Sequence, residues 1–192
     1  PGHDVLFVGT MNEDESTQSL SDKVRDRAHL MRFPRPRTFA NAPKPTGRER
    51  KDGRPDGFLH FESWRSWLRS TAHMRAPDRE RLDGRIDRLN EILDAVGRGF
   101  GHRLHQSMAA YVANYPDGER AADAALADQV EMRILPKLRG IDVETSGRCL
   151  DELRDFVDAE LGDAELAEAV GVARDKARDS GGLFVWTGLT RQ

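Results

Sequence analysis

The chain has 192 residues, of which 33% are charged and 38% hydrophobic, and its formal net charge is −3. This composition is typical of a soluble globular chain with one core or with a small core plus a fragment. The negative charge argues against a protein dedicated to coating DNA. Cys149 is the only cysteine, which excludes an internal disulfide and favours a reducing cytoplasm. No apolar stretch approaches the roughly 20 residues of a membrane span.

The first predicted element is a short apolar run over residues 5–8 that ends at Gly9 and Thr10. Such a run predicts a buried strand of the kind found in the middle of a parallel sheet. Parallel neighbours need crossover connections of about a dozen residues or more, and no sequence before Pro1 is present to supply them. We therefore expect the chain to be a piece of a longer protein.

Two short elements and a basic linker follow this strand. Residues 19–28 predict a helix with Leu20 and Val24 on one face, and residues 30–33 predict a second short strand. The next segment is rich in proline, glycine and basic residues, so it cannot bury enough apolar surface to offset its ordering entropy. The sequence therefore predicts a linker or insertion over residues 34–60.

From residue 61 onward the apolar residues recur at helical spacing, which predicts an all-helical domain over residues 61–192. Pro77 opens the longest helix and the glycines from Gly97 break it, while Pro136 predicts an end or a kink. The apolar end of the chain predicts a short docked strand. The expected helices cover residues 61–68, 77–96, 104–115, 117–134, 150–161 and 164–178, and the strand covers residues 183–186.

Asn12 is the first candidate site residue. It stands just after the apolar strand, and in open α/β sheets ligands bind outside the carboxyl ends of the strands. A carboxamide can orient a water molecule and donate to a phosphate oxygen at the same time. The alternative is an ordinary exit from a strand into a turn, where asparagine is common.

The N-terminal region resembles the second half of the motor domain of McrB-like AAA+ NTPases. The resemblance covers the segment from Val8 to Thr17, then Leu20–Val24 and Asp26-Arg27-Ala28. These nucleotide-driven motors serve modification-dependent restriction systems and related phage-defence proteins. Residues 99–105 resemble the start of that family's lid helix, and residues 134–140 resemble its Ile-Leu-Pro-Lys-Leu/Ile-Arg-Gly segment. The resemblance implies a mainly α fold, in which a helical AAA+ lid-type bundle follows a partial α/β core segment.

The resemblance also implies roles for three residues. Asn12 matches the sensor residue that contacts the γ-phosphate or the attacking water. Arg27 matches the arginine finger that stabilises charge in a neighbouring subunit's site, with Arg25 and Arg32 as alternatives. Arg103 matches the lid arginine that contacts the nucleotide phosphates from the same subunit.

The residues alone also allow plainer interpretations of these arginines. Arg27 can be a surface ion-pair partner of Asp22 or Asp26, and Arg103 can be a solvent-exposed arginine in the first turn of a helix. His102 and His105 have no neighbouring ligand cluster in the sequence, so no metal site is predicted. Cys149 has no histidine partner in its segment and is interpreted as a packing residue.

The chain departs from the family pattern in two respects. Glu15 and Ser16 stand where the restriction GTPases carry Asp and Arg, which leaves ATP and GTP equally open. The sequence contains no Gly-x-x-x-x-Gly-Lys-Ser/Thr and no apolar strand that ends in an acidic pair. We therefore expect ATP or GTP with Mg²⁺ to bind only in a complete motor, and the chain to be inactive alone.

These observations predict the C-terminal part of an AAA+ NTPase motor, with the end of the α/β core at residues 1–33 and a helical lid at 61–192. The expected partners are other copies of the motor subunit in a ring, a nuclease subunit, and DNA through the complex, with no membrane. The first alternative is a non-catalytic helical interaction module. The second is a nucleic-acid binder that acts through the basic linker, which the net charge disfavours.

Overall fold

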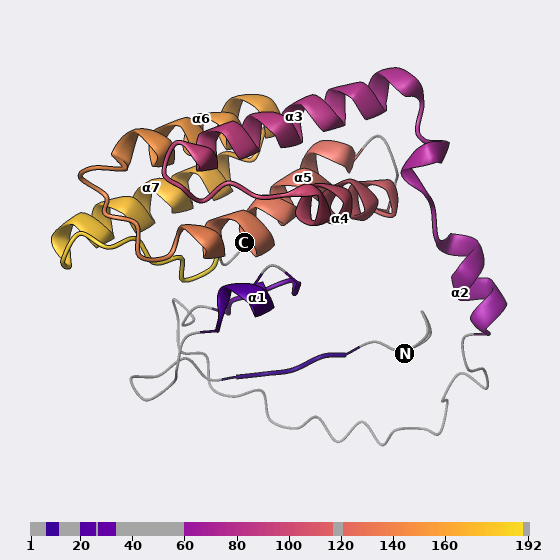
Figure 1. Ribbon diagram of the computed structural model, residues 1–192, viewed down its shortest axis with the longest axis horizontal. Coiled ribbons are helices and arrows are strands. Elements are labelled where there is room, and N and C mark those ends of the chain that lie inside the picture. The colour runs from indigo at the N-terminus through magenta and orange to yellow at the C-terminus, as the bar shows by residue number, and fades with distance from the viewer. Residues whose placement is uncertain (1–6, 12–19, 26, 34–59, 117–120, 190–192) are drawn as a thin grey trace, which may run out of the picture.

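The computed structural model describes residues 7–11, 20–25, 27–33, 60–116 and 121–189 (Figure 1). Asn12 and nearly all of the predicted linker at residues 34–60 lie outside the described residues. The described part is mainly helical, which confirms the coarse fold class. The helices are α1 (Asp22–Arg25), α2 (Phe61–Trp67), α3 (Ala76–Asp94), α4 (His102–Ala113), α5 (Ala122–Gln129), α6 (Gly147–Leu161) and α7 (Ala164–Asp179). None of these helices is both long and apolar enough to cross a lipid bilayer.

Helices α3 to α7 form a bundle around one hydrophobic core (Figure 1). The predicted apolar stripe of α3 is buried in this core, because residues spaced three and four apart share one face of a helix. Pro77 stands in the first turn of α3, where a missing N–H costs nothing, and Gly97 follows the helix with φ +67°. The fully buried side chains of this stripe are those of Ile86, Leu89 and Leu93.

The segment after α5 departs from the single helix predicted to reach residue 134. It continues as a π-helical turn, η3 (Val130–Ile134), and then as a 3-10 helix, η4 (Leu135–Leu138). Pro136 causes part of this change, because it lacks the N–H that would bond to the Met132 carbonyl four residues earlier. The Met132 carbonyl instead accepts a hydrogen bond from the Leu30 N–H, at 3.3 Å. The kink expected at Pro136 thus gives the bundle a binding point for the N-terminal segment.

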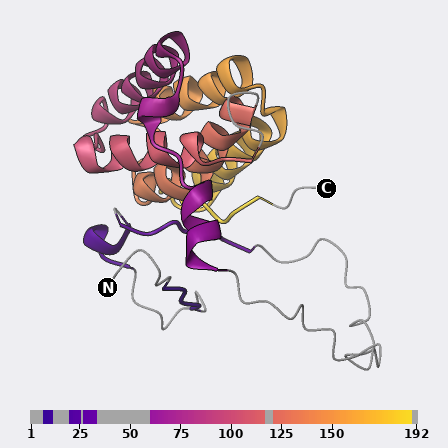
Figure 2. The ribbon, with the colours of Figure 1, turned by 90° about the vertical axis from the view of Figure 1, so that its right-hand side faces the viewer.

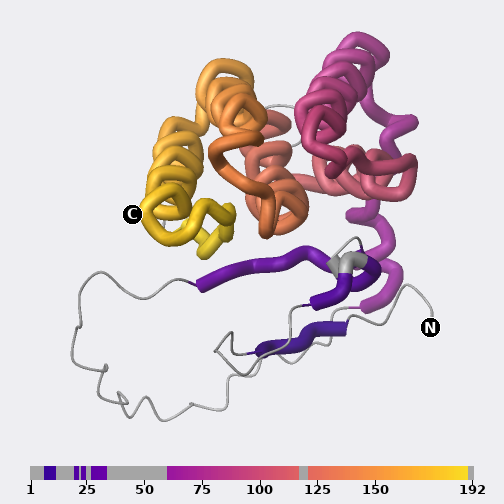
Figure 3. Tube along the Cα trace, turned by 60° about the vertical axis from the view of Figure 1, so that its left-hand side comes forward, coloured from indigo at the N-terminus to yellow at the C-terminus, as the bar shows by residue number. Residues whose placement is uncertain are grey.

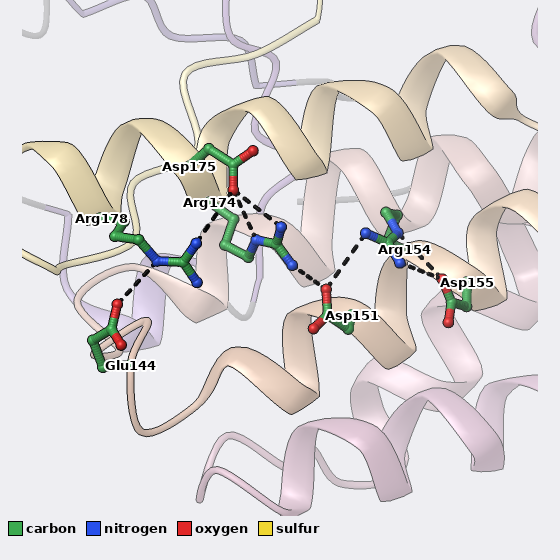
Figure 4. Close-up of polar contacts among 7 residues, drawn as sticks. All are labelled: Glu144, Asp151, Arg154, Asp155, Arg174, Asp175 and Arg178. Atoms are coloured by element: carbon green, nitrogen blue, oxygen red, sulfur yellow. Dashed lines mark hydrogen bonds and ion pairs between the residues drawn. The ribbon is translucent and has the colours of Figure 1, made fainter.

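Helices α6 and α7 pack as a hairpin whose sequence determines both ends of the connection. Gly162 ends α6 with φ +67°, and the Asp163 carboxylate accepts a hydrogen bond from the Leu166 N–H at 3.0 Å to cap α7. Arg174 then joins the two helices by pairing with Asp151 of α6 and with Asp175 of its own helix (Figure 4). These contacts fix the hairpin at its end and along its length.

The predicted strand over residues 183–186 docks onto the bundle as a single antiparallel bridge between Leu183 and Asp142. The Phe184 N–H donates to the Ile141 carbonyl at 2.9 Å, and the Phe184 carbonyl accepts from the Gly140 N–H at 2.8 Å. Phe184 and Trp186 are buried, whereas Leu183 and Val185 are exposed. The docking is therefore as expected and the side chains alternate with a period of two, but the segment forms one isolated bridge and not the predicted strand.

Cys149 is buried in the core, as its interpretation as a packing residue requires. Its thiol donates to the Ile92 carbonyl at 3.3 Å. Burial, together with the nearby charge of Glu152, raises the pKa of Cys149 to about 11. The thiol therefore stays protonated at neutral pH and is a poor nucleophile.

The apolar runs near the N-terminus are not buried as predicted. Residues 7–11 have no regular secondary structure, and the side chains of Phe7 and Val8 are 82% and 91% exposed. Residues 29–33 also lie outside any strand, and Phe33 is 88% exposed. A strand buried on both faces needs neighbouring strands, and the described residues provide none. The prediction of a buried strand is thus wrong for the part of it that the structure describes.

Two further predicted helices are present, but α1 is shorter than expected and α2 does not pack as expected. The predicted helix over residues 19–28 appears as the single turn of α1. Helix α2 has the predicted bounds within one residue, but none of its residues is buried and it projects away from the bundle (Figure 2). Its apolar face therefore does not pack against the bundle.

Candidate functional site

The candidate site lies where the N-terminal segment meets the bundle. Residues 27–33 run along the side of the bundle formed by η3, η4 and the last described residues (Figure 3). A Cβ atom at Gly188 would lie 2.6 Å from the Arg32 carbonyl oxygen, so only glycine permits this close approach. The Leu189 N–H donates to a Glu131 carboxylate oxygen at 3.2 Å. Three separate parts of the chain are thus held together at this point.

A polar group of side chains, called here the His29 cluster, occupies this junction. Gln129 and Arg133 are buried on α5 and η3, and the Gln129 Nε2 atom lies 3.4 Å from His29 Nδ1. The rings of His29 and Tyr111 are 5.5 Å apart, and the Tyr111 hydroxyl donates to Asp128 at 3.1 Å. The cluster consists of His29, Tyr111, Asp128, Gln129 and Arg133.

The electrostatics of the His29 cluster favour a neutral histidine. Burial lowers the pKa of His29, and the positive charge of Arg133 lowers it further. Burial also raises the pKa of Tyr111, and the Asp128 carboxylate adds to that shift. The Gln129 Oε1 atom is buried with no hydrogen-bond partner among the described residues. The cluster can orient the N-terminal segment through hydrogen bonds. A neutral His29 and a protonated Tyr111 hydroxyl fit a structural contact between segments.

The structure places the sequence-predicted arginines on the surface and apart from this cluster. Arg27 is exposed just after α1, and its backbone N–H donates to the Val24 carbonyl at 3.0 Å. Arg103 is exposed in the first turn of α4. Within the described residues, neither guanidinium makes a hydrogen bond or an ion pair, so nothing joins Arg27 to Arg103. Of the alternatives to Arg27, Arg32 is partly buried, and the side chain of Arg25 lies outside the described residues, as do those of Asp22 and Asp26.

His105 has acidic neighbours that the sequence did not reveal. Its Nε2 atom lies 3.8 Å from Asp83 and 3.7 Å from Asp87, which both belong to α3. Over the described ranges, no group of three or more His, Cys, Asp or Glu side chains is arranged to hold a metal ion. The contact is therefore an ion pair between two helices when His105 is protonated.

Neither of two cavities in the bundle surface is lined by Arg27 or Arg103. One, of about 250 Å³, is lined by residues that include Met74, Arg81 and Arg85, and Arg85 pairs with Asp123, which also lines it. The other lies beside the loop at Gly99, and its lining includes the acidic side chains of Glu91 and Asp94, which disfavour a phosphate. Neither of these cavities thus brings the predicted arginines to a nucleotide site.

The His29 cluster could not be predicted from the sequence, for a physical reason. Its members come from three segments that lie far apart in the sequence, and no local spacing links them. One signal was present: Gln129 and Arg133 stand four apart, on one face of the predicted helix, each directly before an apolar residue. Two polar residues on a buried helix face indicate a polar partner from elsewhere in the chain.

The fold and this junction define the chain as a helical-bundle protein to whose side an extended N-terminal segment is attached. A family model for a domain of unknown function, DUF8727, matches residues 58–178, which is more than half of the chain. The chain therefore belongs to the DUF8727 family. The matched region contains α2 and nearly all of the bundle. No curated protein and no solved structure matches the chain.

Proposed function

We propose that this chain is the C-terminal part of an McrB-like AAA+ NTPase motor of a restriction or phage-defence system. In that motor it supplies the helical lid and the last segments of the α/β core. Its partners are other copies of the motor subunit in a ring, a nuclease subunit, and DNA through the complex, in the cytoplasm.

The observation that carries the proposal is the uneven exposure of large apolar side chains. Within the described residues of α3 to α7, Val172 alone is an exposed large hydrophobic residue. The segments before α3 expose many more, and residues 7–11, α1 and residues 27–33 lie along one side of the bundle (Figure 3). The exposed large apolar side chains before α3 are those of Phe7, Val8, Met11, Val24, Met31, Phe33, Phe61, Trp67 and Leu68. A one-sided apolar surface of this kind is typical of a protein interface.

An α/β core half is a suitable cover for this surface. Two apolar runs, at residues 5–8 and 30–33, have the composition of central strands, and the described parts of both lie outside any sheet. Strands supplied by the missing half would pair with these runs and cover their side chains. The motor interpretation therefore explains why residues of this type stand exposed.

The described residues do not fit a complete nucleotide site. They contain no cluster arranged to hold Mg²⁺, and the sequence has no phosphate-cradling loop. In the proposed motor, Arg27 and Arg103 are exposed and available to approach a nucleotide that other residues hold. Asn12, the proposed sensor, lies outside the described residues.

The test uses the protein expressed together with the coding sequence upstream of Pro1. Arg27→Ala is expected to lower hydrolysis of ATP or GTP by on the order of 10³-fold, because a finger arginine acts on the transition state. Arg103→Ala is expected to weaken nucleotide binding by roughly tenfold, as loss of one charged hydrogen bond does.

Arg148→Ala is the matched control, because Arg148 is an exposed arginine on α6 far from either proposed role. It is expected to leave both measurements unchanged. Hydrolysis by Arg27→Ala at the wild-type rate, with Arg25→Ala and Arg32→Ala equally active, rules out the motor function. A stop codon directly upstream of Pro1 does the same.

A non-catalytic interaction module is the second candidate. It is favoured by the family match, which covers α2 and the bundle and leaves residues 7–33 outside. This candidate predicts a well-behaved monomer or dimer when the chain is purified alone. The motor predicts aggregation of the isolated chain, because its apolar runs lack their neighbours.

A further inference from the structure

Helix α2 and the residues that follow it form an exposed arm, called here the α2 arm (residues 60–70). Phe61 and Trp67 are exposed on one side of the helix, and the side chain of Arg65 borders that side. Arg69 follows the helix. Within the described residues, neither the Arg65 nor the Arg69 guanidinium makes a hydrogen bond or an ion pair, and Glu62 is the arm's single acidic residue. The arm is therefore apolar with a basic border.

The root of the α2 arm is fixed to the bundle. The Asn114 side chain accepts from the Arg69 N–H at 2.7 Å and donates to the Arg69 carbonyl at 2.8 Å. The same side chain donates to the Ala110 carbonyl within α4, at 2.8 Å. Directly after Arg69, the Ser70 hydroxyl and the His73 ring cap the turn that leads to α3. A surface held at its root loses little conformational entropy when it binds a partner.

The outer face of α7 carries a stripe of opposite charge, called here the α7 stripe. Its members are all exposed and follow one another at spacings of three and four, so they share one face of the helix. Among the described residues, the carboxylates of Glu165, Glu168 and Asp179 make no ion pair. Val172 lies at the centre and is 61% exposed. The stripe consists of Glu165, Glu168, Val172, Asp175 and Asp179, with Lys176 at its edge.

The arm and the stripe lie at opposite ends of the molecule. Figure 1 shows α2 at one end of the long axis and α7 at the other, with the bundle between them. A chain therefore cannot join its own arm to its own stripe. Any contact between them is made by two copies, and the pair retains one free arm and one free stripe.

We propose that the α2 arm of one copy docks on the α7 stripe of a second copy, head to tail. The aromatic side chains of the arm cover Val172, and Arg65 and Arg69 pair with the stripe carboxylates. Because the two surfaces differ, the contact is heterologous and repeats to give a ring or a filament. The inference rests on the proposed function only because both require copies of the chain to assemble. The arm and the stripe are the surfaces that make this contact.

Two variants remove one surface each. Arg65→Glu with Arg69→Glu reverses the charge of the arm, and Glu165→Lys with Glu168→Lys reverses that of the stripe. All four positions are exposed, so both variants are expected to keep the wild-type circular dichroism spectrum. Sedimentation of the protein expressed together with the coding sequence upstream of Pro1, without nucleotide, is expected to show that each reversal weakens self-association by at least about tenfold. Added salt is expected to weaken wild-type association as well.

A mixture of the two variants is the decisive measurement. The arm variant keeps an intact stripe and the stripe variant keeps an intact arm, and the reversed arm and reversed stripe are again opposite in charge. The mixture is therefore expected to associate as alternating copies in a one-to-one ratio, more strongly than either variant alone. Glu80→Lys with Asp158→Lys is the control, because it changes the net charge as the stripe variant does at exposed positions elsewhere. The control is expected to associate as the wild type does.

Three outcomes overturn the inference. The first is a wild-type chain that stays monomeric at every concentration, and the second is a mixture of folded variants that associates no more strongly than either variant alone. The third is a monomeric chain whose arm binds an oligodeoxythymidine and loses it on Arg65→Glu, because exposed tryptophan and arginine also suit single-stranded nucleic acid. Normal assembly with unaltered hydrolysis in Arg27→Ala, Arg25→Ala and Arg32→Ala, by contrast, defeats the proposed function and leaves this inference intact.

Discussion

The bundle and the region before it contain the same residue types in different surroundings. In α3 to α7 nearly all large apolar side chains are buried, and arginines such as Arg85 and Arg174 pair with carboxylates of other helices. In the described residues of 7–33 and in the α2 arm, large apolar side chains such as Phe33 and Trp67 are exposed, and Arg27 and Arg65 pair with none of the described residues. The bundle therefore covers most of its own apolar side chains, whereas the described parts of the preceding region leave theirs for a partner to cover.

The largest expected effect concerns the bundle core. Leu89→Ala removes a fully buried side chain and leaves a cavity, so it should lower the free energy of unfolding by about 2–5 kcal/mol. Phe33→Ala, at a site that is 88% exposed, should change it by less than about 0.5 kcal/mol. Denaturant unfolding followed by circular dichroism measures both values. Equal losses in the two variants would remove the contrast between the regions.

The second prediction concerns the ion pairs between α6 and α7 (Figure 4). Arg174→Ala breaks contacts to Asp151 and Asp175 at a partly buried site, and should cost about 1 kcal/mol. Arg148→Ala breaks an exposed pair within α6 and should cost less than about 0.5 kcal/mol. Unfolding measured at low and high salt should show the difference shrinking with salt. No difference at low salt contradicts the role given to Arg174.

The third prediction concerns the root of the α2 arm. Asn114→Ala removes the hydrogen bonds to the Arg69 backbone, and should cost about 0.5–1 kcal/mol because the site is exposed. The arm should then be cut faster by trypsin after Arg65 and Arg69. Gln106→Ala, on the exposed side of the same helix, should leave the cleavage rate unchanged. An unchanged rate in Asn114→Ala would show that other contacts hold the arm.

The smallest expected effect is a pH dependence at the junction with the bundle. His29 has a lowered pKa in the folded chain, so the docked segment favours its neutral form. The docking of residues 27–33 is therefore fully favourable above the ordinary histidine pKa of about 6.5, and weakens as the pH falls through the lower folded-state value. Hydrogen exchange of residues 27–33, corrected for the intrinsic rate, should show faster opening at acidic pH. His29→Gln should abolish this dependence.

The bundle was predictable because its information is local. The stripe of Ile86, Leu89 and Leu93 has a helical period, and Pro77 and Gly97 fix where that helix begins and ends. Each of these signals acts within a few residues, and the packing of the bundle favours the same helix. The exposure of Phe7, Val8 and Phe33 was not predictable in the same way, because burial of an apolar run depends on neighbours that local sequence does not reveal.

The candidate site was predictable only in part. Pro136 gave the kink, but the sequence did not show that the Met132 carbonyl would accept a bond from Leu30, about a hundred residues away in the chain. The resemblance to a motor family nominated Arg27 and Arg103, and the structure places both on the surface without bringing them together. Their roles remain predictions that the hydrolysis measurements test.

The π-helical turn at Val130–Ile134 has a consequence for how the family can vary in length. A π-turn holds one residue more than an α-helical turn and leaves the phase of the residues that follow almost unchanged. Deletion of one residue here would restore an α-helix and leave Leu135 and Leu138 in the core, whereas a deletion within α5 would turn the following residues by about 100°. Relatives with this bundle should therefore tolerate the loss of one residue between Val130 and Ile134, in addition to insertions at the loops near Gly97 and Gly162.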